Sequence, residues 1–208
     1  MKRLLGAAKS HSPSDWHTLF LIGIYTGLRL GDCCLLEWKD VNLDRGIIQV
    51  IPRKTRKHSR GMPVTIPIHP ALLEALRNRI GIPSDASNRT SGAPCESSVT
   101  PTPPSGYVLP AISDLYLHSH WQISYTLESI FKAAGIKTSV KIDGRVRATP
   151  EATFHSLRHT FVSLAANAGV PLPVIAAIVG HSSTAMTRHY YHESEAALRR
   201  AVTAVPRL

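Results

Sequence analysis

The sequence predicts a mostly helical α+β domain with one small antiparallel β-hairpin. Apolar residues recur at helical spacing through most of the chain, in segments that end at glycine or proline. Two short segments, 46–52 and 62–68, are rich in β-branched residues, alternate with the period of strands and flank a basic turn. A chain of 208 residues is long enough for one well-packed core. We therefore expect a single domain over residues 1–208.

The N-terminal part of the chain predicts two helices. Residues 16–27 form an apolar stripe that Ser14 and Asp15 are placed to cap, and Gly27 ends this helix. A second helix is expected over residues 31–41. Its expected core positions are Leu35, Leu36 and Trp38.

The middle of the chain predicts the hairpin, a helix and an insertion. The turn over residues 53–61 carries five Lys or Arg residues and no acid, so an anion would stabilise it. His69 and Pro70 then open a helix over 71–80. Residues 81–106 are rich in Ser, Thr, Pro and Gly, which favours a surface loop or a disordered insertion.

The C-terminal half predicts further helices, ended by Gly135, Gly169 and Gly180. Between the first two, residues 137–153 are polar and basic, and they read as either a second small hairpin or a loop. An amphipathic tail over residues 193–208 is expected to form a last helix.

Composition favours a nucleic-acid partner. The chain has 24 Lys and Arg against 14 Asp and Glu, a net charge of +10 and a pI of about 9.9.

No segment approaches the ~20 apolar residues of a membrane helix. Residues 1–13 lack a signal-peptide core and are interpreted as a helix remnant or an arm. Three cysteines cannot form a disulfide framework, so we expect reduced thiols in a cytoplasmic protein.

The segment 154–192 concentrates side chains suited to phosphodiester chemistry. His155 and Arg158 are three residues apart, so they share one face of a helix. Gly180 ends the next helix and presents His181, and Tyr190 follows nine residues later. Helices whose apolar faces pack together can bring these cations, imidazoles and a phenol to one place, where they would form a site for a phosphodiester.

Four segments, taken together, resemble the catalytic domain of tyrosine recombinases, the phage-type integrases. They are YTGLRLGD at 25–32, HSLRHT at 155–160, GHSS at 180–183 and TRHYYH at 187–192. The resemblance implies the family's DNA breaking-rejoining fold. It also implies cleavage through a 3′-phosphotyrosyl link and religation by the 5′ hydroxyl of another strand. The covalent link conserves the phosphodiester's energy, so the resemblance implies neither ATP nor a metal cofactor.

Such cleavage needs a nucleophile, an acid for the leaving group and positive donors for the nonbridging oxygens. Arg29 and Arg158 come from distant segments and can clamp one phosphate from two sides. His155 would be the base, or a donor that switches role, and His181 would bond a nonbridging oxygen or position the tyrosine. Lys54 would protonate the departing 5′ hydroxyl. The expected catalytic set is Arg29, Lys54, His155, Arg158, His181 and Tyr190.

Two assignments have a competitor. Lys54 best matches the family's hairpin lysine, and Lys57 is the competing choice. The Thr-x-x-Tyr-x-His pattern at 187–192 selects Tyr190 over Tyr191 as the nucleophile. Only one of two adjacent tyrosines on a helix can face the phosphate, because they point ~100° apart.

Other polar residues are expected to support the site. Arg29 has a structural alternative, a salt bridge to Asp32 or Glu37, which the downstream motifs make less favoured. Asp32 matches an acidic position of the family and is expected to orient Arg29 or a backbone amide. The residues expected to contact DNA phosphates around the basic turn are Arg53, Arg56, Lys57 and Arg60.

A metal site is not expected. His155 and His159 have the i,i+4 spacing of zinc ligands, but Ser156 stands where the HExxH motif has glutamate. No third ligand has an apt spacing.

The resemblance also implies partners and leaves other functions open. It implies double-stranded DNA, a homotetramer on paired sites with exchange of the C-terminal tail, possible accessory DNA-bending proteins, no membrane, and a nucleoid-associated location. Family members carry a separate N-terminal core-binding domain, so we expect either a fragment or a minimal member. The competing functions are a type IB topoisomerase-like nicking-closing enzyme and a non-catalytic DNA-binding protein on the same scaffold.

Overall fold

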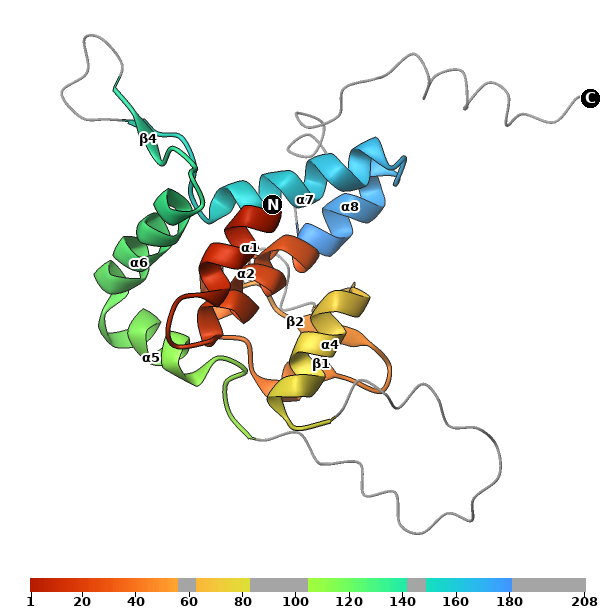
Figure 1. The fold of residues 1–208 in the computed structure, drawn as a ribbon. Helices are drawn as coiled ribbons and strands as arrows, with labels where there is room; N and C mark the ends of the chain where they lie inside the picture. The colour runs from red at the N-terminus through yellow and green to blue at the C-terminus, as the bar shows by residue number, and fades with distance from the viewer. Residues whose placement is uncertain (56–62, 83–104, 142–148, 181–208) are drawn as a thin grey trace, which may run out of the picture.

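The computed structural model describes residues 1–55, 63–82, 105–141 and 149–180, and its fold is mostly helical with two small antiparallel sheets (Figure 1). This confirms the predicted fold class. The helices are α1 Lys2–Lys9, α2 Asp15–Thr26, α3 Leu30–Cys34, α4 Pro70–Arg79, α5 Pro110–His118, α6 His120–Ala133, α7 His155–Asn167 and α8 Leu172–Val179. The strands are β1 Val41–Asn42, β2 Ile47–Val50, β3 Val64–Pro67, β4 Ser139–Val140 and β5 Thr149–Pro150. Two 3₁₀ turns lie at Trp38–Asp40 and Arg53–Thr55. None of the described helices combines the length and the apolar character that crossing a membrane requires.

Helix α2 is the centre of the core. It contacts α1, α4, α5 and α7, so it is covered on several sides (Figure 1). Trp16, Leu19, Phe20 and Ile22 are at most 1% exposed, as the apolar sequence of this helix requires. The predicted end at Gly27 is confirmed, since this residue adopts a left-handed conformation with φ of 64°. The predicted side-chain cap is wrong at Ser14, whose backbone is helical and whose hydroxyl makes no capping hydrogen bond.

Helix α1 is part of the same core. Leu4 and Ala8 are 3% and 0% exposed, and the helix contacts α2 and α6. Residues 2–9 therefore form an ordered helix before the one expected to come first.

The predicted hairpin is present and gains a third strand. Strand β2 pairs antiparallel with β3, with Ile48 opposite Ile66, and with the short strand β1. A second hairpin forms where β4 pairs antiparallel with β5, which favours the hairpin over the loop for residues 137–153. This second hairpin extends from the end of α6 (Figure 1).

The helix expected over residues 31–41 is shorter than predicted. Helix α3 ends at Cys34 because the chain beyond it pairs with the segment that precedes α5. The Trp38 amide donates to the Gly106 carbonyl at 2.9 Å, and the Val108 amide donates to the Leu36 carbonyl at 2.8 Å. Tertiary pairing therefore replaces the helical bonds, although the expected core positions Leu35, Leu36 and Trp38 are all buried.

Gly27 is expected to be intolerant of a side chain. A Cβ at this position would lie 2.8 Å from Phe161 Cδ1 and 3.0 Å from Val179 Cγ1, in a left-handed backbone conformation. Gly27→Ala should lower the free energy of unfolding by about 2–4 kcal/mol, because overpacking adds to the cost of positive φ. Gly46→Ala is the matched control, since its φ is 61° and nothing lies within 4 Å of an added Cβ. Urea unfolding that gave both variants the same loss would contradict the packing argument.

Candidate active site

Three segments that are distant in the sequence bring the described candidate residues together. Arg29 precedes α3, Lys54 lies in the 3₁₀ turn after β2, and His155 and Arg158 lie in the first turn of α7. The charges of Arg29, Lys54 and Arg158 all act on the imidazole of His155, where they lower its pKa. These four residues therefore form one cluster.

The remaining members of the expected set lie outside the described residues. They are His181, Tyr190 and its competitor Tyr191. The same holds for Arg56, Lys57 and Arg60, so the choice between Lys54 and Lys57 stays open. Arg53 and Lys54 are both exposed to solvent, which leaves them accessible for the expected contacts with DNA.

Arg158 is a buried arginine that ties two helix ends together. The residue is 3% exposed. Its Nη1 donates to the Gly27 carbonyl at 2.8 Å, and its Nη2 donates to the Val179 carbonyl at 2.6 Å. Both carbonyls belong to chain turns at the ends of helices, where backbone oxygens lack intrahelical donors. Arg158 therefore supports the turn that leads to Arg29 and the turn that leads to His181.

Sequence reasoning missed this role of Arg158. The signal that was available is the pair of helix-ending glycines, Gly27 and Gly180, both of which adopt left-handed conformations. Helix ends of this kind leave carbonyls that need donors, but the sequence does not say which side chain supplies them.

Arg29 lies at the N-cap of α3 and is partly buried. Its Nη1 is inaccessible to solvent and has no hydrogen-bond partner among the described residues. The alternative salt bridges are not formed in this part of the chain, because Glu37 pairs with Lys39 at 2.7 Å and Asp32 bonds the backbone of Arg53. A buried guanidinium nitrogen without an acceptor is costly, and an anionic ligand would satisfy it.

Asp32 joins the turn after β2 to α3. The residue is 6% exposed, and its Oδ1 accepts a hydrogen bond from the Arg53 amide at 2.9 Å. Burial raises the pKa of Asp32, and the Arg53 amide and the nearby charges of Arg29, Arg158 and Arg53 oppose this rise. Of the two roles expected for Asp32, this geometry fits the one at a backbone amide. The bond fixes the backbone immediately before Lys54.

His155 carries an imidazole that is disposed to stay neutral. Burial lowers its pKa most, followed by the charges of His159, Arg158, Arg29 and Lys54. The rings of His155 and His159 meet edge to face, with centroids 4.6 Å apart. No group of three potential metal ligands occurs among the residues that the structure describes. A neutral imidazole beside two guanidinium groups can accept a proton, as a general base must.

The lowered pKa of His155 predicts how stability depends on pH. The unfolded chain binds a proton at His155 near pH 6.5, whereas the folded chain resists it to a lower pH. The contribution of His155 to the free energy of unfolding is fully present above about pH 6.5, and it is lost as the pH falls through the folded-state pKa. We expect His155→Gln to lose less stability than the wild type between pH 7 and 5 in urea titrations. Identical curves for the two proteins would contradict the assigned shift.

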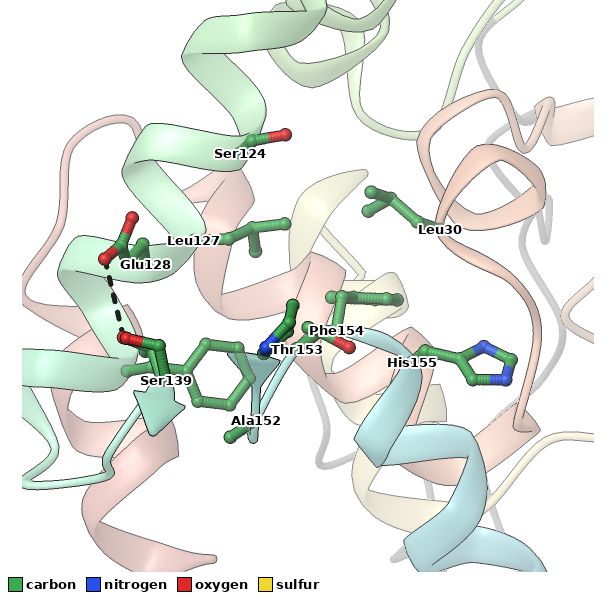
Figure 2. A pocket seen from close by; sticks show the side chains of 12 residues that line it. Leu30, Ser124, Leu127, Glu128, Ser139, Ala152, Thr153, Phe154 and His155 are labelled. Carbon is green, nitrogen blue, oxygen red and sulfur yellow. Dashed lines mark hydrogen bonds between the residues drawn. The ribbon is translucent and has the colours of Figure 1, made fainter. Parts of the chain in front are cut away.

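A pocket opens beside this cluster. It has a volume of about 440 Å³ and is bordered by Leu30, by α6, by the paired strands β4 and β5 and by the start of α7 (Figure 2). His155 lies at one side of this pocket, while Glu128 and Ser139 lie at the other (Figure 2). The pocket and the cationic cluster therefore share one side chain.

The thiols near this site are unreactive. Cys33 and Cys34 are both free and buried. Burial raises the pKa of Cys34 to about 12 and raises that of Cys33 as well, so both remain protonated thiols.

Known proteins with similar sequences are recombinases and integrases. The chain is 25% identical to the tyrosine recombinase XerC-like protein of Caldanaerobacter subterraneus subsp. tengcongensis, over 92% of this chain and 48% of that protein. It is 26% identical to tyrosine recombinase XerA of Pyrococcus furiosus, over 85% of this chain and 50% of that protein. It is 25% identical to the integrase of Salmonella phage P22, over 80% of this chain and 36% of that protein. The chain thus spans about half or less of the length of these relatives.

Solved structures share the fold. The catalytic domain of bacteriophage HP1 integrase matches with a TM-score of 0.62 at 22% identity, covering 99% of this chain and 90% of that chain. XerA recombinase matches with a TM-score of 0.60 at 24% identity, covering 100% of this chain and 61% of that chain. The Tn1549 transposon integrase, solved in complex with transposon right end DNA, matches with a TM-score of 0.64 at 20% identity, covering 97% of this chain and 62% of that chain. The Phage integrase family model matches residues 1–197, and the resemblance seen in the sequence is thereby confirmed: this chain belongs to the phage integrase family of tyrosine recombinases.

Proposed function

We propose that this chain carries the catalytic domain of a DNA strand transferase that performs site-specific recombination. The observation that carries the proposal is the buried Nη1 of Arg29, which lacks an acceptor among the described residues. It belongs to a cluster with Arg158, Lys54 and the neutral imidazole of His155. A DNA phosphate would supply the missing acceptor and would be held by planar, permanently charged donors.

Relatives support the same reaction class. They are named as recombinases and integrases, and the Tn1549 integrase was solved with DNA. Because the chain spans about half of its relatives, the complete reaction, its DNA and its assembly are proposals for this protein.

The chemistry follows from the roles of the side chains. The Tyr190 hydroxyl gives its proton to His155 and attacks phosphorus, while the two arginines stabilise the negative charge on the nonbridging oxygens. The bond from phosphorus to the 5′ oxygen breaks, and Lys54 protonates that oxygen. The product is a 3′-phosphotyrosyl link and a free 5′ hydroxyl, and the reverse reaction with a different 5′ hydroxyl rejoins the strands. His181 bonds a nonbridging oxygen or positions the tyrosine.

The proposed partners follow from charge and family membership. Double-stranded DNA suits a net charge of +10 and the exposed Arg53 and Lys54. Exchange of strands between two duplexes needs paired sites, and we propose a homotetramer in which residues 193–208 dock on a neighbouring subunit. Accessory DNA-bending proteins are a further proposed partner.

Covalent capture of DNA tests the proposal. The chain is incubated with nicked duplexes of randomised sequence, in which cleavage near the nick releases a short fragment and traps the enzyme on DNA. Denaturing gels should show a protein–DNA adduct without ATP or divalent metal, and sequencing of the adduct gives the preferred site. Binding of the duplexes without any adduct would instead indicate a DNA-binding protein that lacks the reaction.

A second assay separates recombination from topoisomerase-like nicking and closing. A plasmid is built with two copies of the captured site, and a matched plasmid carries one copy. A recombinase should give rearranged products only from the plasmid with two sites. Relaxation of both plasmids without rearrangement would assign nicking-closing activity instead.

A further inference from the structure

The pocket beside His155 has the chemistry of a base-binding site and not of a phosphate site. Leu30, Leu127, Phe131 and Phe154 give it apolar walls. None of the described residues that line it is lysine or arginine. Lys132, the cation beside the lining residue Glu128, is already paired with that carboxylate, so it is not free to hold a phosphate. The flat face of a base, by contrast, is compatible with apolar walls.

Polar groups at one side of the pocket fit the edge of a base. Glu128 accepts a hydrogen bond from Thr138 at 3.4 Å and pairs with Lys132 at 2.8 Å. Hydrogen bonding and charge from Lys132 lower the pKa of Glu128, so its carboxylate is ionised and can only accept hydrogen bonds. Both contacts use Oε1, so in the part of the chain that the structure describes Oε2 is available to an amino group.

The pocket lies where a displaced base would be found. His155 belongs both to the proposed phosphate cluster and to the pocket wall (Figure 2). A phosphate held by that cluster would therefore lie next to the pocket. Rejoining to another duplex requires that bases beside the cut leave their original partners. Unstacking a base costs a few kcal/mol, and a pocket that receives the base offsets this cost.

We propose that this pocket receives one unstacked base of the cleaved strand beside the scissile phosphate. It favours bases that carry an amino group, namely adenine, cytosine or guanine, over thymine. The inference rests on the proposed function, because it needs a cut strand at His155. The volume of about 440 Å³ accommodates a base with part of its sugar.

Fluorescence of 2-aminopurine tests the pocket. The captured DNA site is prepared with this analogue at successive positions beside the cut, and the covalent complex is formed with the whole chain. Fluorescence should rise several-fold at one position, because unstacking relieves quenching. Ser124→Trp, at an exposed position on the pocket rim, should remove the rise. Ala133→Trp, also exposed on α6 but outside the pocket lining, is the matched control and should retain it.

The base preference gives a second, independent measurement. Randomised duplexes captured by the wild type should be enriched about tenfold for amino-bearing bases over thymine at the same position. Glu128→Gln should lose this enrichment, because an amide can donate to thymine as well as accept. Glu128 is exposed on α6, so the substitution should leave the fold intact.

The outcomes separate the two proposals. An adduct with no fluorescence rise at any position, or a rise that Ser124→Trp leaves unchanged, would overturn the pocket assignment while the strand transferase stands. An enrichment that Glu128→Gln does not alter would overturn the amino preference. Absence of any adduct from the wild-type protein would overturn the proposed function and the pocket assignment with it.

Discussion

Tyr190→Phe is expected to abolish covalent capture of DNA, with a loss of more than about a thousandfold in adduct yield. The substitution removes one oxygen atom, the proposed nucleophile, and keeps the aromatic ring. Tyr191→Phe is the matched control, because it makes the same change at the adjacent residue. DNA binding should persist in both variants, since the positive charges proposed to contact phosphate are unchanged.

The adduct assay decides between the two tyrosines. Both residues lie outside the described part of the structure, so the choice rests on the sequence pattern alone. Capture by Tyr190→Phe together with its loss in Tyr191→Phe would reverse the assignment. Mass spectrometry of the digested adduct gives the modified residue directly.

Arg158→Ala is expected to lower both stability and cleavage. The change removes two hydrogen bonds and leaves the carbonyls of Gly27 and Val179 without their buried donor. Each unsatisfied buried group costs about 1–3 kcal/mol, so the free energy of unfolding should fall by about 3–5 kcal/mol. Arg158→Lys should recover only part of this loss, because an ammonium group lacks the planar fork that reaches two acceptors.

Comparison with Arg29→Ala distinguishes an arginine that stabilises the fold from one that acts in DNA cleavage. Arg29 has a buried nitrogen without an acceptor among the described residues, so its removal should change the free energy of unfolding by less than about 1 kcal/mol. The adduct yield of this variant should nevertheless fall by about a hundredfold to a thousandfold, because the proposed donor to the phosphate is lost. Urea unfolding and covalent capture measure the two quantities. Equal stability losses in Arg29→Ala and Arg158→Ala would contradict the distinction drawn between the two arginines.

Local signals in the sequence were sufficient for much of the fold. The apolar run of α2 and the left-handed glycine that ends it depend on neighbouring residues only, and both were predicted at the correct place. The β2–β3 hairpin was predicted because alternation and a basic turn are also local features. The end of α3 could not be predicted, because it depends on pairing with residues 106–108, far along the chain.

In the candidate site, too, some features could be predicted from local sequence and others depend on how distant segments pack. The motifs identified Arg29, His155 and Arg158 as members of one cluster, because the family resemblance assigns them by pattern. The bonds from Arg158 to two backbone carbonyls were not foreseen, since the atoms that a guanidinium reaches depend on how α2, α7 and α8 pack. The pocket beside His155 was missed for the same reason, because its walls come from four separate segments.

The bridge made by Arg158 implies that the site assembles cooperatively. The Arg158 guanidinium bonds carbonyls at the end of α2 and at the end of α8. Displacement of either helix end therefore breaks one of its two hydrogen bonds and leaves Arg158 less firmly held to support the other end. Partly assembled arrangements should therefore be rare, and the site should open and close as one unit. Hydrogen exchange at the amides of Gly27 and Gly180 should accelerate together in destabilised variants, and independent rates would show that the two ends are uncoupled.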